Sequence, residues 1–238
     1  MRTFKALSAL ISYPSPDLQA AIPEVRAVCA AEGILSGTQR AALEPLLAHL
    51  AGADLIAAQE EYVRLFDRSR SVSLNLFEHI HGDSRDRGSA MVDLLETYRA
   101  GGYDLAATEL PDHLPVLLEF LSTQPPDEAR AILTDAGEVI AVLAARLRMR
   151  ETPYAAVLDA LSALGGADTG SDFAAALLAE PIDDPDDLEA LDAAWEETEV
   201  TFGPDPNAGC PVSRDMLSRM DMTPSAPIPA ARQAKEAR

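Results

Sequence analysis

Two histidines stand two residues apart in the stretch SLNLFEHIHGDSRDRG, which covers residues 73–88. A glutamate precedes His79, His81 follows it, and Asp83 comes directly after a glycine. Imidazole and carboxylate groups of this kind can bind a transition metal or exchange protons near neutral pH. His113, further along the chain, could supply a third imidazole. One hypothesis is therefore a metal-dependent enzyme or a metal-binding protein that uses His79, His81 and His113.

The spacing of these residues gives a metal site little support. Residues two apart on a helix do not share a face, so only a loop would bring both rings to one ion. The chain has no HExxH or CxxC motif, and it lacks the GxSxG, GxxxxGK[ST] and GxGxxG signatures of nucleophile and nucleotide chemistry. We therefore expect no metal, no cofactor and no catalytic residue. The histidines are then surface or capping groups, or contacts for a bound ligand.

A second stretch, ELPDHLPVLLEFL at residues 109–121, has two interpretations. Asp112 is a good N-cap, and Pro115 then falls in the first turn of a helix whose leucines form core. Alternatively, Asp112 and His113 beside a hydrophobic groove could receive a basic, apolar peptide, because a carboxylate accepts hydrogen bonds from arginine or amide groups.

A third stretch, QEEYVRLFDRS at residues 59–69, carries Tyr62, Leu65 and Phe66 at helical spacing. These side chains are most simply core residues. The acidic run at residues 183–199, DDPDDLEALDAAWEETE, is most simply a solvated face, with docking of a basic partner as the alternative.

Composition excludes several classes of protein. The 238 residues are 47% hydrophobic and only 5% aromatic, and the net charge is −20. Such a surface repels nucleic acid and anionic lipid and suits a basic partner. No stretch approaches the roughly 18 uncharged apolar residues of a membrane span. Cys29 and Cys210 lie far apart, which is compatible with a reducing cytosol. The apolar N-terminal stretch is interpreted as a first helix rather than a signal peptide.

The hydrophobic spacing predicts a succession of helices, and no alternating β-branched segment is long enough to predict a strand. We expect an all-α, single-domain bundle of about eight to ten helices over residues 1–197. Ser15 and Pro16 can begin a helix that Pro23 should kink or divide. A long helix is expected from Pro125 to about Arg150. Apolar residues at helical spacing predict helices at 4–11, 18–25, 43–50, 55–66, 91–98, 114–121, 157–164 and 188–195.

Residues 198–238 differ from the rest of the chain. They contain six prolines and as many basic as acidic residues, so the whole net charge lies on residues 1–197. We expect this C-terminal tail to be mostly disordered.

Taken together, these stretches resemble the redox-enzyme maturation chaperones of the TorD/DmsD/NarJ superfamily. The superfamily shares an EYxxLF-like element, here from Glu61 to Phe66, and a PDHxxxxLxF-like element, here from Pro111 to Phe120. The stretch LFEHIHGDSRDRG resembles the NarJ branch, the nitrate reductase assembly chaperones. The resemblance is strongest over residues 59–122.

The resemblance implies an all-α cytoplasmic protein without enzymatic turnover. It implies binding to the N-terminal segment of the nitrate reductase catalytic (alpha) subunit. That binding would keep the apoenzyme competent for insertion of the molybdenum cofactor, and of an iron–sulfur cluster, before membrane docking. Such chaperones are not part of the finished enzyme, and the resemblance also allows contact with molybdenum-cofactor delivery proteins.

An apolar, basic segment of this kind can bind as an amphipathic helix in a groove, and an acidic body raises its encounter rate. The contacts that the resemblance implies for this client peptide are Tyr62, Leu65, Phe66, Asn75, Phe77, His79, His81, Arg85, Arg87, Asp112, His113, Leu117 and Glu119.

Overall fold

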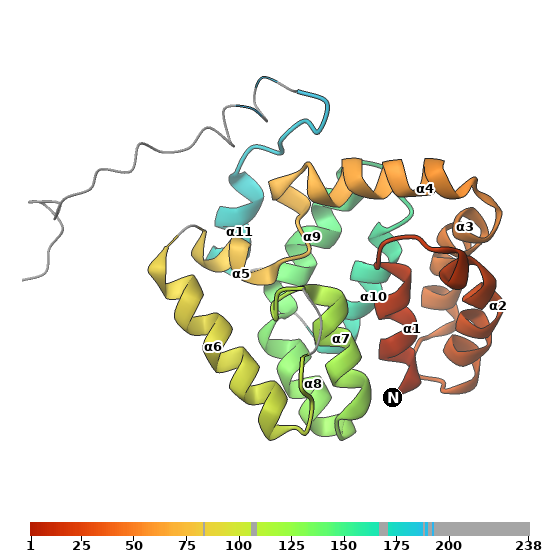
Figure 1. Ribbon diagram of the computed structural model, residues 1–238, viewed down its shortest axis with the longest axis horizontal. Helices are drawn as coiled ribbons and strands as arrows, with labels where there is room; N and C mark the ends of the chain where they lie inside the picture. Colours follow the sequence, from red (N-terminus) through yellow and green to blue (C-terminus); the bar gives the residue numbers. More distant parts are fainter. Residues whose placement is uncertain (83, 106–108, 167–170, 188, 190–191, 193–238) are drawn as a thin grey trace, which may run out of the picture. The chain divides into compact units, whose positions relative to one another are not determined.

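The computed structural model describes residues 1–82, 84–105, 109–166, 171–187, 189 and 192. These residues form helices and no strand, which confirms the all-α class (Figure 1). The predicted tail and the helix predicted at residues 188–195 lie outside the described residues, apart from two isolated positions. The α-helices are α1 (Arg2–Leu10), α2 (Pro16–Ala31), α3 (Gly37–Gly52), α4 (Leu55–Tyr62), α5 (Leu76–His81), α6 (Arg85–Ala100), α7 (Leu114–Thr123), α8 (Pro126–Asp135), α9 (Gly137–Met149), α10 (Ala155–Gly165) and α11 (Asp172–Ala179).

Two short turns join α4 to α5. The first, η1 (Val63–Asp67), is π-helical, and the second, η2 (Arg70–Val72), is a 3₁₀ turn. None of the helices in the described ranges combines the length and the hydropathy that a bilayer crossing requires.

The eleven α-helices of the described part exceed the eight to ten expected, partly because one predicted helix is two. The prediction of one helix from Pro125 to about Arg150 is wrong. α8 ends at Asp135, Ala136 lies between the helices, and α9 begins at Gly137, a residue type that weakens helices. In contrast, α2 runs through Pro23 undivided, and it buries Ile22 and Val25 on either side of the proline.

Other helix ends follow their sequence signals. Ser15 caps α2 as expected, since its hydroxyl accepts a hydrogen bond from the backbone N–H of Leu18 at 3.1 Å. α10 ends at Gly165 and is followed by the C-cap residue Gly166, whose φ of +66° is the left-handed conformation that favours glycine.

The hydrophobic core runs from α1 through α10. In Figure 1, α1, α7, α9 and α10 occupy the middle of the bundle, with α2 and α3 on one side and α6 along the opposite edge. α1 packs on α7 and α9 on α10. One of these central helices, α7, begins directly after Asp112 and His113.

Close packing of α10 against α8 gives a stability prediction. A Cβ at Gly165 would lie 2.9 Å from the backbone oxygen of Leu133, which cannot move aside freely. Gly165→Ala should therefore lower the free energy of unfolding by about 1–3 kcal/mol, measured by urea denaturation. Gly52→Ala is the matched control. Its Cβ meets nothing within 4 Å, so we expect no loss, and equal losses in both variants would contradict the argument.

Candidate functional site

The histidine stretch and the Asp112 stretch meet through their backbones. Leu76 N donates to Asp112 O at 3.1 Å, and Leu114 N donates to Leu74 O at 2.8 Å. Asn75 and His113 thereby form an isolated antiparallel bridge, and their side chains approach to 3.3 Å between Oδ1 and Nδ1. We call residues 73–81 and 112–114 together the junction.

Asp112 caps a different helix from the one that the sequence suggests. Its Oδ2 accepts a hydrogen bond from Phe77 N at 3.0 Å, at the start of α5. The N-cap residue of α7 is His113, whose side chain forms no capping hydrogen bond, so the predicted capping of α7 by Asp112 is wrong. The reason is that the bridge turns the carboxylate toward α5. Asp112 is only 1% exposed, and this burial raises the pKa of its carboxyl group against the lowering effects of Phe77 N–H and Arg87.

Each histidine ring of the junction has a protein partner. His79 Nε2 lies 2.8 Å from Ser73 O, which fits a neutral ring that donates to this carbonyl. His81 packs edge-on against Phe77, with ring centroids 5.7 Å apart. Among the residues that the structure places, no three His, Cys, Asp or Glu side chains are arranged to hold a metal ion. Asp83 lies outside that set. The hypothesis of a metal-dependent enzyme therefore gains no support here.

Burial divides the predicted peptide contacts into two groups. Tyr62, Leu65, Phe66 and Leu117 are at most 8% exposed and, like Asp112, belong to the interior. In the junction, Asn75, Phe77, His79, His81 and His113 remain accessible to a ligand, whereas Ser73, Leu74, Leu76 and Leu114 are buried like Asp112. Half-buried or exposed members of the predicted set are Asn75, Phe77, His79, His81, Arg85, Arg87, His113 and Glu119.

Not all accessible residues belong to the junction. Arg85 and Arg87 begin α6, just after the histidine stretch. Glu119 lies further along α7, where its carboxylate is 3.3 Å from Lys5 Nζ and 3.3 Å from Tyr103 Oη. The structure therefore brings Asn75, Phe77, His79, His81, Asp112 and His113 together and leaves Glu119 beside α1.

Tyr62, Leu65 and Phe66 of the EYVRLFD stretch belong to the hydrophobic core that also includes Leu74 and Leu76 of the junction. The Tyr62 hydroxyl donates to Ile11 O at 3.0 Å, and the Tyr62 and Phe66 rings lie 4.9 Å apart. Phe66 also packs edge-on against Tyr154 at 5.2 Å. The stretch thus ties the end of α1 to the start of α10, and its last five residues form the π-helical turn η1. Such turns are rare and often occur at functional sites.

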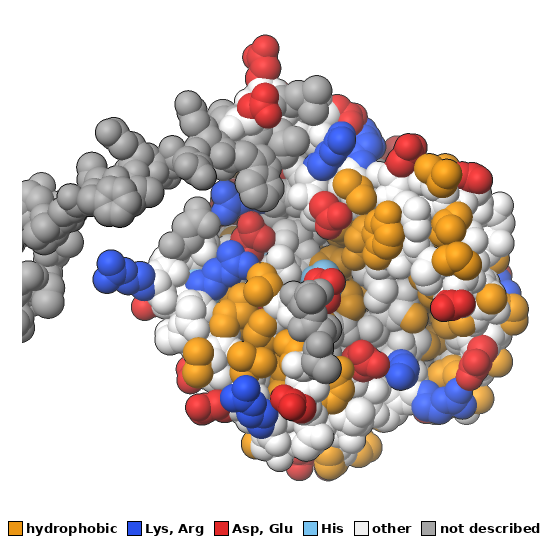
Figure 2. All heavy atoms as spheres, viewed as in Figure 1, with side chains coloured by type: hydrophobic (Ala, Val, Ile, Leu, Met, Phe, Trp, Pro, Cys, Tyr) orange, Lys and Arg blue, Asp and Glu red, His pale blue; other side chains and the backbone are white. Residues whose placement is uncertain are grey.

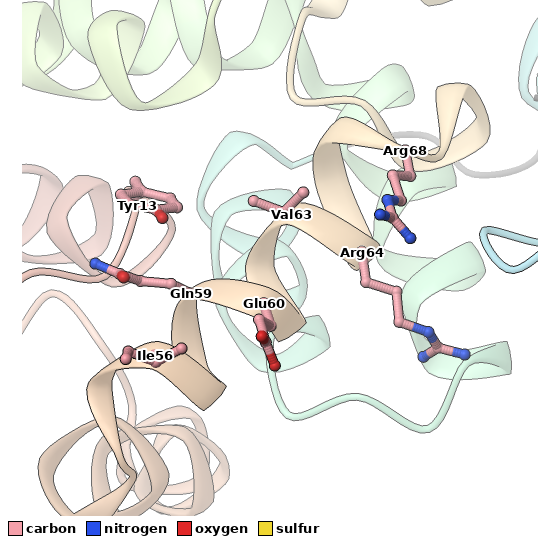
Figure 3. A pocket seen from close by; sticks show the side chains of 7 residues that line it. All are labelled: Tyr13, Ile56, Gln59, Glu60, Val63, Arg64 and Arg68. Atoms are coloured by element: carbon pink, nitrogen blue, oxygen red, sulfur yellow. The ribbon is translucent and has the colours of Figure 1, made fainter.

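Sequence reasoning missed a surface pocket beside this stretch. The pocket has a volume of about 460 Å³ and combines apolar side chains with two arginines (Figure 3). Tyr13, 50% exposed, packs edge-on against Tyr62 at its rim. The sequence feature that could have indicated the pocket is Tyr13, an aromatic residue between the predicted helices at 4–11 and 18–25. The lining residues are Tyr13, Ile56, Gln59, Glu60, Val63, Arg64 and Arg68.

One face of the body carries exposed hydrophobic side chains. Figure 2 shows them gathered beside α6 and beside the end of α1, with a hollow between the two groups. The exposed large hydrophobic residues include Ile80 in the junction, Leu110 next to it, and Val92 on α6. Exposed apolar groups near a partly open polar site are typical of protein-binding surfaces.

The two half-buried histidines of the junction, His79 and His113, predict a pH dependence of stability. Burial lowers the pKa of both His79 and His113. The histidines of the unfolded chain therefore bind protons more readily than those of the folded protein. Their contribution to the free energy of unfolding is complete above the usual histidine pKa of about 6.5. It is lost as the pH falls toward the pKa values of the folded state. Asp112 acts in the opposite sense, because its pKa is raised.

The expected result is that acidification from about pH 7.5 to about 5.5 lowers the free energy of unfolding of the wild type more than that of His79→Gln/His113→Gln. Urea denaturation at both pH values measures it. An identical pH dependence for the two proteins would contradict the burial of neutral histidines.

Comparison of the sequence with known proteins assigns the chain to a family. The model of the family described as nitrate reductase delta subunit matches residues 34–160, more than half of the chain. The chain belongs to the nitrate reductase delta-subunit family. The match to this family runs from before α3 into α10, so it includes the EYVRLFD stretch and the whole junction.

Individual relatives in the family are similar over most of their length. The nitrate reductase molybdenum cofactor assembly chaperone NarJ of Escherichia coli K12 is 43% identical over 203 residues, which cover 85% of this chain and 86% of NarJ. The probable chaperone NarW of the same organism is 38% identical over 88% of this chain and 87% of NarW. The probable NarJ of Bacillus subtilis is 32% identical over 68% of this chain and 86% of that relative. The resemblance seen in the sequence is thereby confirmed.

Proposed function

We propose that this chain is an assembly chaperone for nitrate reductase that acts during maturation of its molybdenum site. The observation that carries the proposal is the 43% identity to a chaperone so named, over 85% of the chain and including the junction. The chain itself then performs no catalytic turnover and is not part of the finished enzyme. It needs no cofactor of its own.

We infer further that the client segment is the N-terminus of the catalytic (alpha) subunit, bound at the junction. Phe77, His81 and His113 are accessible there, and exposed Ile80 and Leu110 extend the apolar surface. The body around them is strongly acidic, which favours a basic, apolar segment. An amphipathic helix would bury its apolar side on these residues.

The buried residues of the predicted set then have a supporting role. Asp112 holds the start of α5 through Phe77 N, and therefore fixes where Phe77 and His81 lie. Tyr62, Leu65, Phe66 and Leu117 are buried in the hydrophobic core that also includes Leu74, Leu76 and Leu114 of the junction. A rigid site reduces the ordering that the protein must undergo, whereas the peptide still loses entropy, so binding stays reversible.

Reversible binding suits the sequence of events that we propose. The chaperone holds the apoenzyme in the cytoplasm until the molybdenum cofactor, and an iron–sulfur cluster, have been inserted, and it delays membrane docking meanwhile. Molybdenum-cofactor delivery proteins would meet the client in this complex.

The test is the molybdenum content of the client. Nitrate reductase purified from cells that lack this chain should contain several-fold less molybdenum than enzyme from cells that have it, by elemental analysis. Phe77→Ala/His113→Ala should reproduce much of the deficit, because it removes accessible contacts at the junction. Met149→Ala, which truncates a 63% exposed side chain on α9, is the control and should restore normal loading. Full molybdenum content without the chain would refute the proposed function.

A further inference from the structure

An acidic segment after α11 is attached to the body by hydrogen bonds and ion pairs. We call residues 180–187, EPIDDPDD, the strap. The strap has no helix or strand, and none of its side chains is buried; even Ile182 is 37% exposed. It therefore lacks the apolar anchoring that holds the helices in place.

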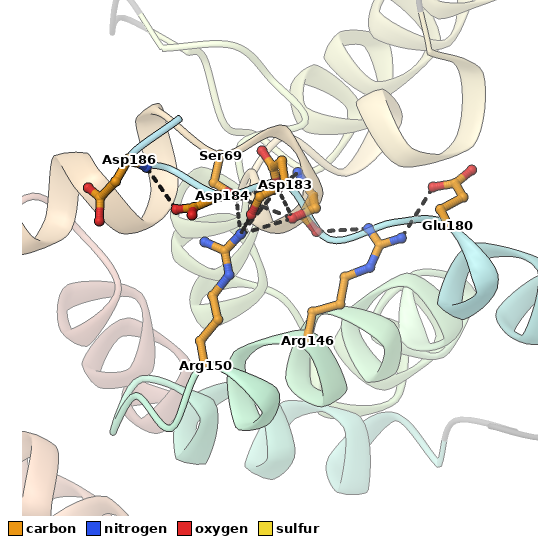
Figure 4. Close-up of polar contacts among 8 residues, drawn as sticks. Ser69, Arg146, Arg150, Glu180, Asp183, Asp184 and Asp186 are labelled. Carbon is orange, nitrogen blue, oxygen red and sulfur yellow. Dashed lines mark hydrogen bonds and ion pairs between the residues drawn. The ribbon is translucent and has the colours of Figure 1, made fainter. Parts of the chain in front are cut away.

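Asp183 is the centre of the strap's attachment (Figure 4). Its Oδ1 accepts hydrogen bonds from Ser69 Oγ at 2.8 Å, from Ser71 N at 3.3 Å and from Arg150 Nη2 at 3.1 Å. The Ser71 hydroxyl donates to the same oxygen. Four donors from the body thus converge on one carboxylate oxygen.

The donors are built into the body, whereas the strap lies on its surface. Ser69 is fully buried, and the Arg150 side chain is only 13% exposed. Hydrogen bonds from Ser71 and Ser69, together with Arg150, hold the pKa of Asp183 below its usual value although burial acts to raise it. We call Ser69, Ser71 and Arg150 the oxyanion cradle. A preorganised set of donors of this kind binds anions whether or not they belong to the same chain.

The cradle and its neighbour offer more donors than Asp183 uses. Arg150 Nη1 and Arg146 Nε are buried, and neither has a hydrogen-bond acceptor in the part of the chain that the structure describes. The Arg146 side chain is only 2% exposed and is held in place by Ser71 O at 2.8 Å. A buried N–H without an acceptor lowers the stability of the fold. These two groups could therefore donate hydrogen bonds to further acceptor oxygens of a ligand.

The chemistry of this donor set fits a phosphate group better than a carboxylate. A phosphate offers more oxygens, so hydroxyl, backbone N–H and guanidinium donors can each reach an oxygen instead of sharing one. The planar guanidinium group of arginine binds phosphate strongly, because two of its N–H groups can donate in parallel to two phosphate oxygens.

We propose that the oxyanion cradle is a phosphate-binding site and that Asp183 occupies it from within the chain, so that the strap is a displaceable plug. Release of the strap also affects the pocket of Figure 3. Arg64 Nε donates to Asp186 Oδ1 at 2.9 Å, and Arg64 lines that pocket with Arg68. Loss of Asp186 returns the charge of Arg64 to the pocket.

The experiment is titration calorimetry of the full chain with inorganic phosphate, and separately with a small phosphate monoester, at constant ionic strength. Asp183→Ala should bind phosphate about ten-fold or more tightly than the wild type, because the internal competitor is gone. Adding Ser71→Ala to this variant should reverse the gain. Asp17→Asn, which removes one acidic charge from α2, is the control and should bind like the wild type. Binding of both ligands shows that the site recognises the phosphate group itself, and binding of inorganic phosphate alone assigns it to the free ion.

Two results would overturn the proposal: no gain of phosphate binding in Asp183→Ala, or a gain that survives Ser71→Ala. If Asp183→Ala does not fold in chloride, circular dichroism replaces calorimetry. Recovery of helicity in phosphate but not in chloride of equal ionic strength would then support the site, and no recovery would refute it.

Discussion

Replacing Phe66 by alanine is expected to lower the free energy of unfolding by about 3–5 kcal/mol, the range for a fully buried aromatic side chain. Phe66 is 4% exposed and contacts the rings of Tyr62 and Tyr154. Its removal leaves a cavity where η1 meets α10, and those elements cannot close it without moving the end of α1. Urea denaturation followed by circular dichroism measures the loss.

Tyr13→Ala is the matched control for Phe66→Ala. Tyr13 belongs to the same aromatic group but is 50% exposed, so we expect a loss of only about 1 kcal/mol. A Phe66→Ala protein with unchanged stability and reduced client binding would mean that Phe66 contacts the peptide directly. The division of the site into core support and accessible contacts would then be wrong.

Replacing Arg146 by methionine is expected to cost about 2–4 kcal/mol of stability. The buried guanidinium donates to Ser71 O at 2.8 Å and to Leu177 O, and its Nη2 lies 3.2 Å from Glu180 Oε2. Methionine fills similar space but leaves two carbonyl groups without these donors, and each hydrogen bond from a charged group contributes about 1.5–3 kcal/mol. The loss should appear in urea denaturation and include the docking of α11 on α9.

Arg148→Met tests whether burial is the reason for this cost. Arg148 lies two residues along the same helix, and its side chain is 54% exposed where it pairs with Asp159. Exposed ion pairs contribute about 0–1 kcal/mol, so this variant should be nearly as stable as the wild type. Similar losses in both variants would contradict the role assigned to the buried arginine.

The local features of the fold were predictable because their causes are local. Ser15 and Pro16 begin α2, and Gly166 ends α10, through interactions within one helical turn. The break at Ala136 was not predictable from hydrophobic spacing, since apolar residues continue at helical intervals on both sides of it. α11 was missed for a similar reason, as its alanine-rich stretch has no distinct polar face.

The stretches that meet at the junction could be singled out from the sequence, but the way in which they meet could not. The junction joins Asn75 to His113, and such a bridge between distant segments leaves no periodic signal in either one. Asp112 therefore looked like a cap for the helix that follows it, whereas it caps α5. Likewise, the acidic run at 183–199 was interpreted as a solvated face; Asp186 is indeed exposed, but Asp183 is half-buried and pairs with Arg150, just after α9.

The most direct test of the account is titration calorimetry of the full chain with a peptide that copies the N-terminal segment of the nitrate reductase catalytic subunit. We expect one peptide to bind per chain with a dissociation constant in the micromolar range and a negative heat-capacity change, because apolar surface is buried. Phe77→Ala/His113→Ala should weaken binding about ten-fold or more, and Met149→Ala should not change it. Absence of binding at several hundred micromolar peptide would mean that the binding free energy is weaker than about −5 kcal/mol, and it would contradict the proposed peptide site.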